Sequence, residues 1–84
     1  MLHNVFTVFD SKTEAYLPPF YEQTKGSAIR SFTEAVNTPS HQFAKYPGDF
    51  TLFHLGTYDD TNSHFELFDT PMSVGVAIEF LNKQ

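Results

Sequence analysis

The pattern of apolar and polar positions begins with a β-strand. Residues 4–9 combine β-branched and aromatic side chains, which is typical of β-structure. Val5, Thr7 and Phe9 would share one face of this strand, opposite the face of Phe6. Because both faces are largely apolar, we expect the strand to lie in the interior of a sheet.

A proline pair marks the next segment, which follows a polar turn. Residues 15–21 have an extended character and contain Pro18 and Pro19, neither of which can donate a backbone hydrogen bond. Such a segment suits the edge of a sheet, or a polyproline-type arm, better than a central strand. We therefore expect an extended arm between the first strand and the first helix.

Apolar residues with helical spacing follow the arm. From Ala28 to Val36 they recur at i, i+1, i+4, i+7 and i+8, which places them on one stripe of a helix. Thr24 is the expected N-cap of this helix, and residues 37–39, Asn-Thr-Pro, are its expected end.

The C-terminal half predicts a β-hairpin and a second helix. Residues 50–58 and 64–68 are strand-like, and the turn-forming residues 59–63 separate them. Pro71 and the apolar spacing after it predict a helix that begins near Thr70. The expected order is strand, extended arm, helix, strand, strand, helix, with both helices packed on one face of a small antiparallel or mixed sheet. The fold class is therefore α+β, and the 84 residues form a single domain.

The aromatic content suggests a binding surface. The chain has ten Phe, four Tyr and no Cys, so it has no disulfide to support a small core. A core of this size has little room for fourteen rings. Some rings should then lie in a subunit interface or on a surface that faces a ligand. We expect a homo-oligomer for this reason.

Charge is distributed unevenly along the chain. The net charge is −5, and residues 49–84, with six acidic residues and one basic, account for all of it. An acidic chain repels a polyanion at long range, so a nucleic-acid site would need a local patch in residues 1–48. No apolar run approaches the roughly 20 residues that cross a bilayer, and no signal peptide is visible. We expect a cytoplasmic protein that has no membrane contact.

The sequence shows no pattern typical of catalysis. The four histidines lack the spacing of metal ligands, and although His54 and His64 could face each other across the hairpin, two ligands are too few. The glycines are scattered, and no nucleophile elbow or calcium loop is present. We therefore expect a binding protein that is not an enzyme and that uses no metal and no cofactor.

The remaining candidate site combines rings and bases in the N-terminal half. Single-stranded nucleic acid is bound by rings that stack on bases, beside cations that follow the backbone. The alternative is that the arm's aromatic residues dock on a neighbouring subunit. The candidate residues are Lys12, Tyr16, Phe20, Tyr21, Lys25, Arg30, Lys45 and Tyr46.

Several segments resemble the small nonstructural protein of gokushoviruses, which are bacteriophages of the microvirus family with circular single-stranded DNA. The most distinctive are residues 16–20, Tyr-Leu-Pro-Pro-Phe, and residues 40–43, Ser-His-Gln-Phe; the resemblance covers essentially the whole chain. It implies a nonstructural protein in the cytoplasm of the host bacterium that binds single-stranded DNA during genome replication or packaging. The alternative is an oligomeric module that contacts a viral or host protein and regulates replication or assembly without touching DNA.

Overall fold

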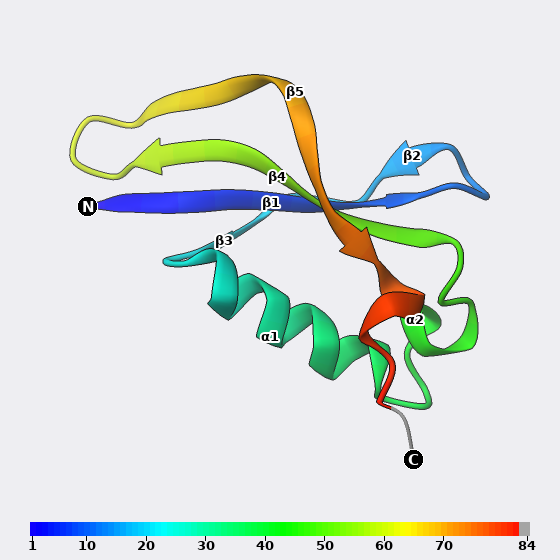
Figure 1. The fold of residues 1–84 in the computed structure, drawn as a ribbon. Coiled ribbons are helices and arrows are strands. Elements are labelled where there is room, and N and C mark those ends of the chain that lie inside the picture. The colour runs from blue at the N-terminus through cyan, green and yellow to red at the C-terminus, as the bar shows by residue number, and fades with distance from the viewer. Residues whose placement is uncertain (83–84) are drawn as a thin grey trace.

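Five strands form one antiparallel sheet that twists strongly along its length (Figure 1). The computed structural model describes residues 1–82. The strand order is β2-β1-β4-β5, and β3 also pairs with β1. The strands are β1 (Leu2–Asp10), β2 (Ala15–Tyr16), β3 (Phe20–Glu22), β4 (Phe50–Asp59) and β5 (His64–Val76).

The central strand is β1, as its two apolar faces predict. The four side chains from Val5 to Val8 are all buried, although successive side chains point to opposite faces of the sheet. One edge of β1 pairs with β4 over its whole length, and the other edge pairs with β2 and β3. The prediction of an interior strand is confirmed.

The proline arm lies along the free edge of β1. Its two short strands, β2 and β3, flank Pro18 and Pro19, where the regular ladder is interrupted. Leu17 closes part of this gap, because its N–H donates to the carbonyl of Val8 at 2.8 Å and its carbonyl accepts from the Thr7 hydroxyl at 2.7 Å. The expected edge position of the arm is confirmed.

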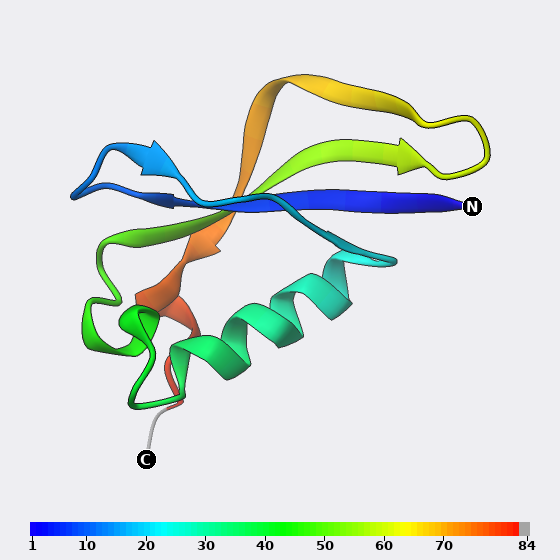
Figure 2. The ribbon, with the colours of Figure 1, turned by 180° about the vertical axis from the view of Figure 1, so that it is seen from behind.

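Helix α1 (Lys25–Val36) covers one face of the sheet and begins where the sequence predicts (Figure 2). The Thr24 hydroxyl accepts from the backbone N–H of Ser27 at 3.0 Å and caps the helix. A short helix, α2 (Gln42–Lys45), follows α1. The core between these helices and the sheet contains Phe6, Val8, Ala28, Phe32, Val36, Phe43, Phe50, Leu52 and Ala77.

The predicted second helix, expected to begin near Thr70, is wrong. Strand β5 continues to Val76, and only a single 3-10 turn, η1 (Ala77–Phe80), follows it. The free edge of β4 explains this difference, because residues 72–76 complete the ladder along Thr51 to His54. Tertiary pairing thus outweighs a helical spacing of apolar residues. The α+β fold class is confirmed, and the helical layer consists of α1 with the short α2 and η1.

Candidate functional site

The sheet has one face that no helix covers. Phe6 and Leu52 point toward α1, so the side chains next to them in sequence point to the opposite side. We call this opposite side the open face. The strand register places on it His3, Phe9, Tyr16, Tyr21, Phe53, Tyr58, Phe65 and Leu67.

One cluster of rings lies at the β2 end of the open face. The ring centroid of Tyr16 lies 4.8 Å from that of Phe9 and 5.9 Å from that of Phe53. Tyr16 is 53% exposed, so one side of its ring remains available to a ligand. Packing against two neighbours holds this exposed ring in a fixed position.

A second cluster lies at the hairpin end of the sheet, and Figure 1 shows that this end lies opposite the end that carries β2. The Tyr58 ring contacts Phe65 at 4.7 Å and Tyr21 at 5.8 Å between centroids. His3, Tyr21 and Tyr58 line a shallow hollow of about 180 Å³. Tyr21 and Phe65 are 45% and 51% exposed. Two half-exposed rings beside an imidazole make a surface on which a planar aromatic group can stack.

Only one acidic residue of the described strands, Asp69 of β5, falls on the open face, because it shares the side of Leu67. The alternation of side chains puts Asp10, Glu22, Asp59 and Glu66 on the helix side of the sheet. Asp60, in the turn beside the hollow, contacts His3 through Oδ2 and Nε2 at 2.8 Å. The open face therefore carries much less negative charge than the net charge of the chain implies.

The terminal amine lies against the turn acids. It donates to Oδ1 of Asp60 at 2.7 Å and lies 3.6 Å from Oδ1 of Asp59. The hydrogen bond from this amine lowers the pKa of Asp60, and the carboxylate in turn raises the pKa of the amine. These opposite charges partly neutralise the acidic turn next to the hollow.

The ring residues predicted in the arm divide between the two sides of the sheet. Tyr16 and Tyr21 lie on the open face, as described above. Phe20 points the other way and packs against Phe6, with centroids 5.8 Å apart. Tyr46 lies at the C-terminal end of α2 and is exposed.

The predicted bases do not gather on the open face. Lys25 and Arg30 belong to α1, on the covered side of the sheet, and Lys45 belongs to α2. Lys12 lies in the turn after β1 and lines a hollow together with Tyr46. The structure therefore does not bring the eight candidates together into one track.

Four rings of the open face were missed in the sequence: Phe9, Phe53, Tyr58 and Phe65. The bases of residues 1–48 pointed to the N-terminal half, whereas three of these rings lie beyond it. The alternation of side chains along each predicted strand was the available signal. Alternation alone does not say which faces of different strands coincide. The pairing register, including the shift between Val5 and Phe6, is what places all four rings on one face.

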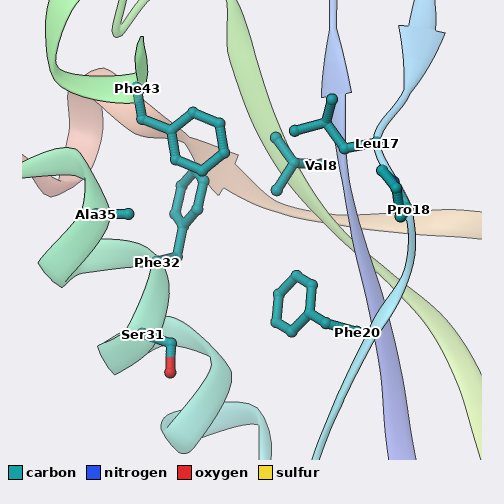
Figure 3. Close-up of a pocket in the computed structure, with 8 residues that line it drawn as sticks. All are labelled: Val8, Leu17, Pro18, Phe20, Ser31, Phe32, Ala35 and Phe43. Atoms are coloured by element: carbon teal, nitrogen blue, oxygen red, sulfur yellow. The ribbon is translucent and has the colours of Figure 1, made fainter. Parts of the chain in front are cut away.

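An apolar pocket of about 240 Å³ opens between α1 and the proline arm (Figure 3). Phe32 and Phe43 face it from the helices, and Leu17 and Phe20 face it from the arm. Ser31 is the one polar side chain of its lining. Because it has few polar groups, this pocket offers no evident chemistry beyond apolar contact.

His54 packs against two phenylalanine rings. Its ring stacks on Phe6 at 4.6 Å between centroids and meets Phe68 edge-on at 4.9 Å. Nε2 lies 3.1 Å from Oδ1 of Asn4 and 3.2 Å from the carbonyl of Gly56, which can only accept, so Nε2 carries a hydrogen. Partial burial lowers the pKa of His54, and nearby Lys25 lowers it further.

The suggested contact between His54 and His64 is wrong, because His54 pairs with Met72 whereas His64 pairs with Asp59. The extra β5 residues around the bend shift the register and separate the two rings. Among residues 1–82, no group of three or more histidine or acidic side chains is placed to hold a metal ion. No helix within that range is long and apolar enough to cross a membrane.

The pKa of His54 predicts how stability depends on pH. A depressed pKa in the folded state means that the unfolded chain takes up this proton more readily. Above pH 6.5, the ordinary pKa, the group is neutral in both states; below it, stability falls until the folded pKa is reached. We expect the urea midpoint to decrease on acidification through this window.

The His54→Gln variant should show a weaker pH dependence, because glutamine does not titrate. His64→Gln is the matched control, since His64 lies exposed on the hairpin, and it should keep the dependence of the parent chain. An equal pH dependence in the parent and in His54→Gln would contradict the assignment.

A family model described as Phage ORF5 protein matches residues 3–80. This match spans all five strands and the helices between them. Searches of curated proteins and of solved structures gave no match.

Proposed function

This chain belongs to the Phage ORF5 protein family, and we propose that it binds single-stranded DNA on its open face during replication or packaging of the viral genome. The resemblance of residues 16–20 and 40–43 to the gokushovirus nonstructural protein supports single-stranded DNA as the nucleic acid. In this proposal the protein works in the host cytoplasm and acts by binding, without catalysing a reaction.

The observation that carries the proposal is a helix-free sheet face with exposed rings and a single strand carboxylate, that of Asp69. Tyr16, Tyr21 and Phe65 each expose about half of their surface there. Stacking of a base on an aromatic side chain contributes roughly 1–3 kcal/mol and tolerates any base. Unpaired bases offer the flat apolar groups that this surface can stack, whereas the bases of a duplex are already stacked on each other.

The position of the basic residues determines how much of the affinity comes from phosphate contacts and how much from stacking. No strand position on the open face carries Lys or Arg in the described part of the chain. Stacking would therefore supply most of the affinity, and few phosphates would be neutralised. We expect a shallow salt dependence, because the slope scales with the number of phosphate contacts.

The proposal is tested by fluorescence anisotropy with a labelled oligothymidine. Tyr21→Ala removes one stacking ring from the hairpin cluster, and we expect it to weaken binding roughly 5- to 150-fold, the equivalent of about 1–3 kcal/mol. Tyr46→Ala is the matched control, because Tyr46 is also exposed but lies on α2, away from the open face.

The Tyr46→Ala control also tests whether DNA binds on the open face or elsewhere on the protein. Equal losses in Tyr21→Ala and Tyr46→Ala would move the site away from the open face. No change in anisotropy at low salt, where electrostatic attraction is strongest, would overturn DNA binding altogether.

A second candidate function is a protein-interaction module that regulates phage replication or assembly without DNA contact. The observation that favours it is the apolar character of the same face, which carries rings and Leu67 but no cation. A viral or host protein with an apolar surface could bind this face without any basic side chain on it. In that case the parent chain, like its open-face variants, would leave oligothymidine unbound at every salt concentration.

A further inference from the structure

The hairpin end of the sheet lacks a hydrophobic layer on either face. Every residue from Asp60 to Thr70 is exposed, and so is Met72. Phe65 and Leu67 point to the open face, whereas Phe68 points to the helix side and meets His54. Helix α1 does not extend under this part of the hairpin (Figure 1). β1 supports the hairpin along β4, but no layer covers the sheet here, so large exposed apolar side chains at this position indicate a partner.

The outer edge of β5 has the backbone groups to receive a strand. β5 is the last strand in the sheet order and pairs with β4 alone in the described chain. The unpaired N–H and C=O groups of such an edge are a template for another strand. Pro71 has no N–H, so the usable edge runs from His64 to Thr70.

We propose that the partner is a second copy of this chain, paired antiparallel with the first along this edge of β5. Two identical antiparallel strands are related by a two-fold axis, so the axis passes through the middle of the paired segment. The midpoint between His64 and Thr70 is Leu67, which places the two Leu67 side chains opposite each other. This register sets Glu66 opposite Phe68 of the partner copy and avoids a direct acid–acid pair.

The exposed area fits a moderately stable dimer. A large ring removes roughly 150–250 Å² from water when it is buried. The half-exposed Phe65, Leu67, Phe68 and Met72 then offer on the order of 400 Å² per copy. A standard interface needs about 800 Å² per partner, so side chains supply about half and the strand edges must supply the rest. We therefore expect a dissociation constant in the micromolar range.

The two-fold pairing joins the open faces of the two copies. Residues opposite each other in an antiparallel pair point to the same side of the sheet. With Leu67 opposite its counterpart, the open faces of both copies lie on one side and form a continuous surface. The hairpin ring clusters, with Tyr21, Tyr58 and Phe65, then lie near the two-fold axis in both copies. The dimer itself does not depend on DNA binding.

Sedimentation velocity on the full chain without DNA tests the dimer. We expect the sedimentation coefficient to rise between about 1 and 100 µM, a range that brackets micromolar affinity. Added salt should strengthen association, because it screens the acidic residues of the two hairpins, whereas it should weaken DNA binding.

Leu67→Lys should weaken the dimer at least about 10-fold, the equivalent of about 1.4 kcal/mol. Ile78→Lys, which changes an exposed residue of η1, should leave it unchanged.

A cysteine variant tests the register directly, since the natural chain has no cysteine. Leu67→Cys should form a disulfide-linked dimer under mild oxidation, because directly opposite Cβ atoms in a strand pair lie about 4.5–5.5 Å apart and a small shift brings them to the roughly 3.5–4.5 Å of a disulfide. Ile78→Cys is the matched control and should remain a monomer on a non-reducing gel. A chain that stays monomeric over the whole concentration range, or equal cross-linking of both variants, would overturn the proposal.

Discussion

Gly56→Ala is expected to lower the melting temperature of the protein strongly. Gly56 has a φ of +148°, and an added Cβ would lie 2.1 Å from the carbonyl oxygen of Glu66 and 2.7 Å from Cα of Leu67. Strained backbone costs about 1–3 kcal/mol, and overpacking costs a further 1–3 kcal/mol or so. The combined loss, about 2–6 kcal/mol, is a large fraction of the stability of a domain of this size, which is about 4–13 kcal/mol.

Gly48→Ala is the matched control for this substitution. A Cβ at Gly48 meets no atom within 4 Å, so the same chemical change should leave stability almost unaffected. Thermal unfolding followed by circular dichroism compares the two variants directly. Similar melting temperatures for Gly56→Ala and the parent would show that β4 and β5 are not in close contact at this point.

Phe6→Ala is the second substitution with a large expected effect. Phe6 is fully buried, and its ring lies between Phe20 at 5.8 Å and His54 at 4.6 Å between centroids. Truncation of a buried Phe costs about 3–5 kcal/mol, because it removes apolar contacts and leaves a cavity. We expect a large decrease in the urea midpoint of unfolding at constant pH.

Phe65→Ala provides the comparison on the exposed side. Phe65 is 51% exposed and contacts Tyr58 in a cross-strand ring pair, so its loss should cost about 1 kcal/mol or less. The same variant should weaken both oligothymidine binding and dimer formation. A Phe65→Ala chain as unstable as Phe6→Ala would show that the hairpin cluster belongs to the core and is not a binding surface.

The local elements near the N-terminus could be predicted because their signals are short-range. The alternation in β1 and the Thr24 cap of α1 depend on residues close together in the chain. The edge position of the arm follows from Pro18 and Pro19, which cannot donate to a ladder in any context. These predictions needed no knowledge of distant contacts.

The predictions that failed depended on long-range pairing. The residues around Val74 have a helical spacing, but the free edge of β4 draws them into a strand that ends at Val76. The register shifts along β4 separate His54 from His64. A shift of one residue reverses every side chain of a strand, so face assignments require the register and not the composition alone.

The sequence by itself determined that this is a small α+β domain with an interior strand, a proline arm at an edge and one capped helix. It also indicated, from the number of rings, that some aromatic residues lie outside the core. Only the tertiary structure decided which rings these are, because strand pairing, and not chain position, selects the side to which each ring points. The tertiary structure therefore places the candidate surface on the open face and the edge of β5, and not on the basic N-terminal half.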